Sequence, residues 1–338
     1  MSTEENIQNN LVIKQENIKQ KDIKLENNDQ KNIKQENINQ ENIDQENIEQ
    51  EDVFQIDVRD LVHSFKPDLK LPFFIYSYLN RILHVKKLNQ IHTESARKGG
   101  TIEDFLSTFV EICDFDFTIT GPGYEELKQQ KGQFLVASNH PYGGSEAISI
   151  MNNLISYHKD LKLVAQSFLV YLAPELKKCS VFNRNSLSSF LEAVREKKPI
   201  MIYPAGFCSR MLSNKVIFDY DWKSTFIKIV IRNKIPLYVV YVDGHVSNHV
   251  INWTRFRNFF HIKTNVELIY LIDEMIKSGG KAHKMVVSKP INPEVFTPDV
   301  SYEEWAARIR QYCYFLSKDP NLEFNPELKA DFSILPLK

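Results

Sequence analysis

The chain has 338 residues, of which 43% are hydrophobic and 25% charged, so it is long enough for two average domains or one large one. No stretch approaches the ~18–20 consecutive apolar residues of a membrane-spanning helix, and the first residues lack the basic and apolar parts of a signal peptide. The four cysteines are widely spaced without a CxxC pair, which favours neither a metal site nor a disulfide framework. We therefore expect a cytoplasmic protein.

Charge and composition divide the chain in two. Residues 1–52 hold 13 acidic residues against 6 lysines and no Gly, Pro or aromatic residue, whereas the rest holds 36 basic against 30 acidic residues. From Gln15 onward, this first segment repeats every five residues around Gln-Glu-Asn-Ile-x. A five-residue step advances about 140° around a helix, so the isoleucines form no stripe. One apolar residue in five does not offset the entropy of ordering the chain.

A β-solenoid with a five-residue turn also fits this period, but it needs small interior residues where the repeat has Glu, Lys or Asp. We predict a disordered repeat tail over residues 1–52 and a globular domain over residues 53–338.

The first element of the domain is a predicted helix over Leu71–Ile91, rich in aromatic and basic residues. It fits either a membrane-interface helix or a helix that covers the sheet. After it, strands and helices alternate, which predicts an α/β fold with a mostly parallel or mixed central sheet flanked by helices. The predicted strands are Phe115–Thr120, Gln133–Ser138, Lys162–Ala165, Ile200–Pro204, Pro236–Val242 and Lys284–Ser288. The predicted helices are Ser145–His158, Leu187–Lys198, Trp222–Arg232, Val266–Ile276 and Tyr302–Leu316.

The end of the second predicted strand carries a motif with catalytic potential, because ligands of such sheets bind where strands end. Residues 139–146 (NHPYGGSE) place a histidine at the strand end, a tight turn after it, and an acid at the start of a helix. Histidine accepts a proton near neutral pH, and Glu146 beside a helix N-terminus stays ionised and can orient the imidazole. We predict His140 as a general base with Glu146 as its partner. In the alternative, Ser145 caps the helix and His140 binds only a backbone group.

The fourth predicted strand ends in a second polar turn. Residues 200–210 (IMIYPAGFCSR) run from a buried strand through Pro and Gly to Ser209 and Arg210. Arginine binds phosphate and carboxylate groups through two parallel hydrogen bonds, so this turn favours a phosphate-bearing substrate. The alternative is an ordinary turn with a surface arginine.

Other sites receive less support from the sequence. Asp243 and His245 follow the fifth strand and are a third candidate pair for the same cleft. Cys208 has no histidine paired with it by spacing, so we do not expect a thiol nucleophile. The GxSxG, GxxxxGK[ST] and GxGxxG motifs are absent from the sequence.

Together the motifs resemble the glycerolipid acyltransferase superfamily, the PlsC-type family that includes 1-acylglycerol-3-phosphate acyltransferases. The closer resemblance is to a bacterial branch with NHPxGGx[DE]G and FPAGxxSR motifs, described as glycerol acyltransferase or hemolysin-like. It covers roughly residues 54–316. The matching segments are 139–146, 203–210, 222–227 and 240–248.

The resemblance implies transfer of a fatty acyl group from acyl carrier protein or coenzyme A to a lysophospholipid-type acceptor in phospholipid biosynthesis. It implies a peripheral protein at the inner face of the cell membrane, with no bound cofactor or metal and no nucleic acid partner. His140 would deprotonate the acceptor hydroxyl, Glu146 would stabilise the imidazolium, and glycine amides would bind the oxyanion. The predicted substrate-binding residues are Asn139, Gly143, Gly144, Gly206, Ser209 and Arg210.

Two departures from the family pattern leave the acceptor open. The acid follows His140 by six residues instead of five, and Ala205 stands where the commonest form of the second motif has Glu. An amino-acid-derived lipid such as lyso-ornithine lipid is therefore an alternative acceptor. A non-catalytic lipid-binding protein of the same fold is a second alternative.

Overall fold

The computed structural model describes residues 53–182, 187–211, 217–247 and 267–334. The predicted repeat tail lies outside the described residues, and so does Val266, the predicted first residue of one helix. In the described part, no helix has the length and the apolar character needed to cross a bilayer.

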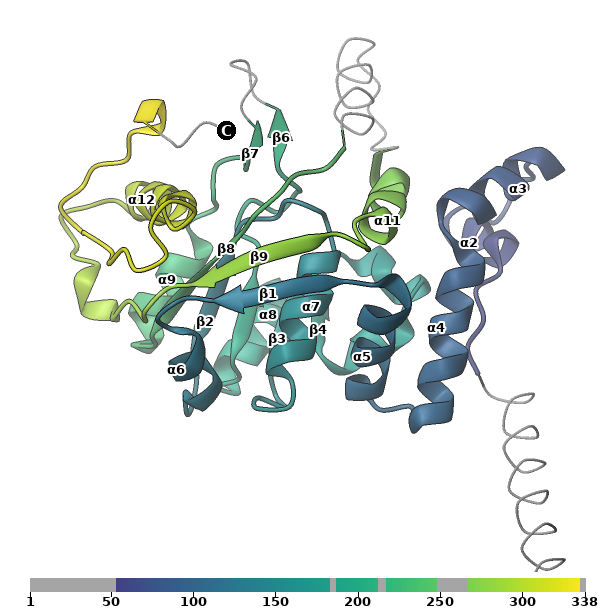
Figure 1. Cartoon of the computed structure of the whole chain (residues 1–338), viewed down its shortest axis with the longest axis horizontal. Helices are drawn as coiled ribbons and strands as arrows, with labels where there is room; N and C mark the ends of the chain where they lie inside the picture. Colours follow the sequence, from purple (N-terminus) through teal and green to yellow (C-terminus); the bar gives the residue numbers. More distant parts are fainter. Residues whose placement is uncertain (1–52, 183–186, 212–216, 248–266, 335–338) are drawn as a thin grey trace, which may run out of the picture. The chain divides into compact units, whose positions relative to one another are not determined.

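A seven-stranded sheet in the order β1-β9-β8-β2-β5-β3-β4 lies at the centre of the fold (Figure 1). Neighbouring strands of this sheet are parallel except for β8 and β9, which are antiparallel. The strands are β1 (Asp116–Thr120), β2 (Leu135–Ser138), β3 (Lys162–Ala165), β4 (Ser180–Phe182), β5 (Ile200–Ile202), β8 (Leu237–Val242) and β9 (Ala282–Val287). The prediction of a mostly parallel or mixed sheet is thereby confirmed, and every predicted strand is present.

Helices cover both faces of the sheet, because side chains of the central strands alternate between two apolar clusters. On β8, Tyr238 and Val240 pack with α4, α5, α7 and α11, whereas Leu237 and Val239 pack with α8, α9 and α12. The α-helices are α2 (Val58–Phe65), α3 (Phe73–Ile82), α4 (Val85–Lys98), α5 (Ile102–Cys113), α6 (Tyr124–Gln129), α7 (Ser145–Leu154), α8 (Leu187–Arg195), α9 (Thr225–Asn233), α11 (Glu267–Lys277) and α12 (Tyr302–Phe315). A strand buried on both sides explains why β8 reads as an unbroken apolar run.

The prediction of one helix over Leu71–Ile91 is wrong. The chain forms α3 and α4 instead, with a break at His84, which adopts a left-handed conformation with φ of 50°. The His84 Nε2 atom lies 2.7 Å from Asp273 Oδ1 on α11. This contact with a distant part of the chain holds His84 in the left-handed conformation, which a right-handed helix does not allow.

Three strand ends meet at one edge of the sheet. β2 lies between β5 and β8 and runs parallel to both, so the residues after Ser138, Ile202 and Val242 emerge side by side. A two-stranded hairpin, β6 (Arg210–Met211) and β7 (Ile217–Phe218), follows the turn after β5. The sequence did not predict this hairpin or β4.

Candidate active site

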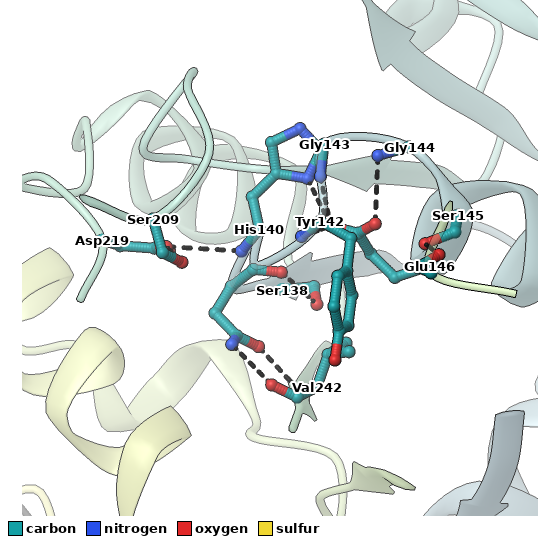
Figure 2. A network of polar contacts seen from close by, with 12 residues as sticks. Ser138, His140, Tyr142, Gly143, Gly144, Ser145, Glu146, Ser209, Asp219 and Val242 are labelled. Carbon is teal, nitrogen blue, oxygen red and sulfur yellow. Dashed lines mark hydrogen bonds and ion pairs between the residues drawn. The ribbon is translucent and has the colours of Figure 1, made fainter. Parts of the chain in front are cut away.

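His140 and Glu146 form a hydrogen-bonded pair in the turn after β2 (Figure 2). The His140 Nδ1 atom lies 2.8 Å from Glu146 Oε1, and Glu146 is fully buried while the His140 side chain keeps 16% of its surface exposed. The backbone amides of Tyr142 and Gly143 donate to the same Oε1 at 3.2 and 3.3 Å, and the Gly144 amide donates to Oε2 at 3.0 Å. The carboxylate therefore has four donors around it although no water reaches it.

These donors set the charge of the pair. Burial by itself raises the pKa of Glu146, but attraction to His140 and the hydrogen bonds from the imidazole and the amides outweigh burial and lower that pKa below its ordinary value. An ionised carboxylate only accepts hydrogen bonds, so Nδ1 of His140 carries the proton. The Nε2 atom then carries a free lone pair, which can accept a proton from a substrate.

Two glycines let the turn fold tightly enough to bring the acid back to the histidine. Gly143 has a φ of 82°, and a Cβ at this position would lie 2.6 Å from the sulfur of Cys208. A Cβ on Gly144 would lie 2.5 Å from the sulfur of Met275. Because a sulfur atom lies this close at both positions, neither leaves room for a side chain, and the tight turn between the histidine and the acid requires glycine.

Ser145 has a different role from Glu146. Its hydroxyl oxygen accepts a hydrogen bond from the hydroxyl of Ser278 at 2.9 Å. The structure places Glu146, the acid that the sequence predicted as the partner of His140, against the imidazole.

Asn139 ties the motif to the neighbouring strand. Its side-chain amide donates to the carbonyl of Val242 at 2.8 Å, and its side-chain oxygen accepts from the Val242 amide at 2.7 Å. Asn139 is buried, and both of these bonds go to the backbone at the end of β8. Through these two bonds Asn139 fixes the position of the backbone that leads into His140. A contact between Asn139 and substrate remains a prediction.

A second buried carboxylate, Asp219, holds the other side of His140. Its Oδ1 atom accepts from the Ser209 hydroxyl at 2.6 Å and from the His140 backbone amide at 3.3 Å. Its Oδ2 atom accepts from the Trp222 indole at 2.9 Å. The Ser209 amide also donates to the His140 carbonyl at 2.8 Å, so Ser209 joins the two turns through its backbone and its side chain.

Sequence reasoning missed Asp219, which arrives from the hairpin β6–β7. Burial raises the pKa of this carboxyl above its ordinary value, although the hydrogen bonds from Ser209 and Trp222 partly oppose the effect. The available signal was an acid directly after the apolar pair Ile217–Phe218, a place where a solvated carboxylate is not expected.

An apolar cavity of about 420 Å³ lies beside the histidine, and His140 forms part of its wall. This volume falls in the range of small-molecule pockets, ~300–1,000 Å³. Aliphatic and aromatic side chains make up most of the wall, with His140, Gln166 and Lys223 among the polar groups. Six of the apolar residues are Ile148, Leu163, Phe168, Leu172, Leu176 and Met275. An apolar cavity with an imidazole in its wall suits a hydrocarbon chain with a reactive group at its end.

The turn after β5 forms another part of this wall. The ring of Tyr203 stacks on the His140 imidazole with a centroid distance of 4.1 Å, and the Gly206 amide donates to the Tyr203 carbonyl at 2.9 Å. Lys223 is exposed, lines the cavity, and is fixed at its backbone by a 3.1 Å bond from its amide to the Pro204 carbonyl. It is a basic group that the sequence motif contained but that sequence reasoning did not assign.

Other predicted residues are not brought to the cavity. The side chain of Arg210 lies outside the described part of the chain, so its predicted contact with an anion stays a prediction. Nδ1 of His245 lies 2.8 Å from the Val246 carbonyl oxygen, and Asp243 accepts from the Tyr241 hydroxyl at 3.2 Å. Neither Asp243 nor His245 is among the described residues that line the cavity, so we set this pair aside.

Comparisons with known proteins agree with this geometry. The sequence profile of a family described as acyltransferase matches residues 64–322. A lyso-glycine lipid O-acyltransferase of Bacteroides thetaiotaomicron is 30% identical over 254 residues, which cover 73% of this chain and 91% of that protein. A protein of the same name from Phocaeicola vulgatus is 28% identical over 253 residues, which cover 73% and 88%. The crystal structure of the 1-acyl-sn-glycerophosphate acyltransferase PlsC from Thermotoga maritima matches with a TM-score of 0.42 and 13% identity over 73% of this chain and 89% of that chain. This last likeness is too distant to inform the chemistry.

Proposed function

Since the chain belongs to the acyltransferase family, we propose that it transfers a fatty acyl group from a thioester to the hydroxyl of a lyso amino-acid lipid. The observation that carries this proposal is the buried His140–Glu146 pair on the wall of an apolar cavity. The names of the two bacterial relatives make a lyso-glycine lipid the first candidate for the acceptor. These names favour the alternative acceptor from the sequence analysis, an amino-acid-derived lipid, over the lysophospholipid-type acceptor that was its main expectation.

The proposed reaction needs one base and no covalent intermediate on the protein. Nε2 of His140 takes the proton of the acceptor hydroxyl while the oxygen attacks the thioester carbonyl carbon. Glu146 holds the imidazolium that forms, because its carboxylate is already ionised and fixed by amides. Proton transfer by a positioned base contributes roughly 10²–10⁴-fold to such a rate.

The acyl donor enters with its chain in the cavity. Either acyl carrier protein or coenzyme A fits this proposal, because the cavity wall contacts the hydrocarbon chain and not the group that carries the thiol. Lys223 stands on the wall beside Gly206, where an added Cβ would lie 3.5 Å from the lysine Nζ. Glycine keeps a free carboxylate when its amino group is acylated. We propose that the ammonium of Lys223 binds this carboxylate of the acceptor, because the two groups carry opposite charges.

Lipid substrates require access to a membrane surface, and α3 presents apolar side chains that suit one. Phe73 and Phe74 are 77% and 68% exposed, and Lys66 and Lys70 precede the helix. Aromatic residues beside lysines bind the interface of anionic bilayers. We propose a cytoplasmic protein docked at the inner face of the membrane, and replacing both phenylalanines with serine should reduce sedimentation with anionic vesicles.

The deciding experiment uses the purified full chain and its His140→Ala variant. Palmitoyl-coenzyme A and palmitoyl-acyl carrier protein are each offered with lyso-glycine lipid, its methyl ester, lyso-ornithine lipid and lysophosphatidate, and products are read by mass spectrometry. We expect a His140-dependent product with lyso-glycine lipid and a weaker reaction with the methyl ester, which lacks the charge for Lys223. A folded His140→Ala variant with full activity, or a preference for lysophosphatidate, would overturn the proposal.

A further inference from the structure

The turn that holds Glu146 contains one large side chain. Residues 141–144 read Pro-Tyr-Gly-Gly, and a glycine has neither a side chain to pack nor a restricted backbone. The amides of Tyr142 and Gly143 both donate to Oε1 of Glu146, so the position of the carboxylate depends on this backbone. The side chain of Tyr142 is the part of the turn that can fix it against the rest of the fold.

A histidine on β9 binds the Tyr142 hydroxyl. The Nδ1 atom of His283 lies 2.8 Å from that oxygen, and the centroids of the two rings are 4.6 Å apart. Both side chains are buried, and the Tyr142 ring extends away from the imidazole of His140 (Figure 2). Because β9 runs antiparallel to β8, its first residues lie beside the end of β8, at the edge of the sheet where the candidate active site lies.

The partners of His283 fix the direction of this hydrogen bond. Its Nε2 atom lies 3.0 Å from the carbonyl oxygen of Ser278, which only accepts, so Nε2 carries a proton. In the neutral imidazole Nδ1 is then an acceptor, and the Tyr142 hydroxyl donates to it. Burial raises the pKa of Tyr142 well above its ordinary value, and the charges of Asp243 and Glu146 raise it further, so the hydroxyl keeps its proton.

The surrounding segments fit these two side chains closely. The ring of Phe117 on β1 stacks on His283 with a centroid distance of 4.7 Å and an angle of 30° between the planes. A Cβ on Gly244, just after the end of β8, would overlap the hydroxyl oxygen of Tyr142. Segments from three distant parts of the chain therefore enclose one hydrogen bond between the turn and the sheet.

We propose that His283 is a positioning residue for acyl transfer, because through Tyr142 it fixes the turn whose amides hold Glu146. A carboxylate held in this way keeps the imidazole of His140 in the tautomer that leaves Nε2 free to act as the base. The inference rests on the proposed function and adds a residue 143 positions away from the base that controls its orientation. His283 acts on the chemical step, so substrate binding should not depend on it.

The test compares the wild-type full chain with its His283→Phe and Tyr142→Phe variants. Each variant keeps a ring in place and removes the hydrogen bond between the two side chains. Transfer kinetics are measured with palmitoyl-coenzyme A and lyso-glycine lipid. We expect kcat to fall on the order of tenfold in each variant, because a small displacement of a catalytic group slows the reaction, and both KM values to stay unchanged. The double variant should lose no more than either single variant, since all three lack the same contact.

Two further measurements separate positioning from stability. His283→Gln should recover most of kcat, because its neutral amide can accept from Tyr142 and donate to Ser278. Nitrogen NMR of protein labelled with ¹⁵N-histidine reports the tautomer of His140, whose signals are those that the His140→Ala variant lacks. We expect the Nδ1–H form to dominate in the wild type and both tautomers to be populated in His283→Phe.

His158→Phe is the matched control, because His158 Nε2 lies 2.7 Å from the carbonyl oxygen of Leu127 and its ring contacts Phe134 with a centroid distance of 4.8 Å. This variant should lose stability but keep its kcat and the tautomer of His140. With an active wild type, full kcat and an unchanged tautomer in His283→Phe would overturn this inference and leave the proposed function intact. A wild type that transfers to none of the offered acceptors would overturn the proposed function, and this inference with it.

Discussion

The two buried carboxylates beside His140, Glu146 in the turn after β2 and Asp219 after β7, are equally buried, but their pKa values are shifted in opposite directions. Glu146 has a pKa below its ordinary value and Asp219 has one above it. Glu146 accepts from an imidazole and three backbone amides, whereas Asp219 accepts from a hydroxyl, an indole and one long amide bond. Burial raises the pKa of both carboxylates, and attraction to His140 lowers both. For Glu146, this attraction and the hydrogen bond from the imidazole are the largest effects that oppose burial, and they outweigh it.

This contrast separates two roles in the site. Glu146 touches the ring that gains a proton in the proposed reaction, so its charge would stabilise the transition state of that reaction. Asp219 touches only the backbone of His140, together with Ser209 and Trp222, so it acts as a positioning residue. Substitutions that remove the charge of each carboxylate test whether charge at Glu146 and geometry at Asp219 are separable.

The largest effect is expected from Glu146→Gln. A glutamine fills the same space but cannot stabilise the imidazolium, and it can offer an N–H to Nδ1, which would favour the wrong tautomer. We expect kcat for acyl transfer to fall on the order of 10²-fold with a folded protein. Glu323→Gln, an exposed residue paired with Lys289, is the control and should be fully active. Equal kcat values for the two variants would remove Glu146 from the mechanism.

A smaller effect is expected from Asp219→Asn. The amide keeps one acceptor oxygen for Ser209 or Trp222 but turns an N–H toward the other donor. Leaving such donors unsatisfied costs about 1–3 kcal/mol of stability. We expect kcat to fall about tenfold through displacement of His140, with the KM for both substrates unchanged. A loss of stability without any loss of kcat would show that Asp219 supports the fold but does not position the base.

The same contrast explains what the sequence could predict. Glu146 was predicted because it lies six residues from His140, and the two glycines between them indicate a tight turn that brings the acid back to the histidine. Asp219 lies 79 residues from His140, and no spacing rule connects the two. Tyr203 was inside a predicted motif, but its stacking on His140 follows only from the pairing of β5 with β2.

The fold shows the same limit. Short runs of apolar residues predicted each strand of the sheet that the sequence analysis named, and the runs in β2 and β8 are continuous because these strands are buried on both faces. The direction of β9 and the break at His84 depend on contacts with remote residues: β9 pairs with β8 in an antiparallel register, and His84 binds Asp273. Such contacts are invisible in a local pattern.

Acid should affect the two carboxylates in opposite directions. The lowered pKa of Glu146 means that its charged form contributes stability above the ordinary value of 4.5, and that this contribution is lost as the pH falls through the lowered pKa. The raised pKa of Asp219 means that the native state prefers the protonated form, so its contribution declines as the pH rises from 3.8 through the raised pKa. The stability deficit of Glu146→Gln should therefore grow with pH, and that of Asp219→Asn should shrink. Urea unfolding of both variants and wild type between pH 4 and 8 measures this, and slopes of the same sign would contradict the assignment.

The smallest effect is expected from Ser145→Ala, which asks whether the neighbour of Glu146 shares its role. Ser145 accepts only a hydroxyl bond from Ser278, whose own oxygen lies 2.7 Å from the Met275 carbonyl, so the variant leaves no donor stranded. We expect a loss of about 1 kcal/mol in the free energy of unfolding and an unchanged kcat, because Ser145 has no contact with the imidazole. A fall in kcat comparable to that of Glu146→Gln would mean that the whole start of α7, and not the single carboxylate, holds His140 in its reactive form.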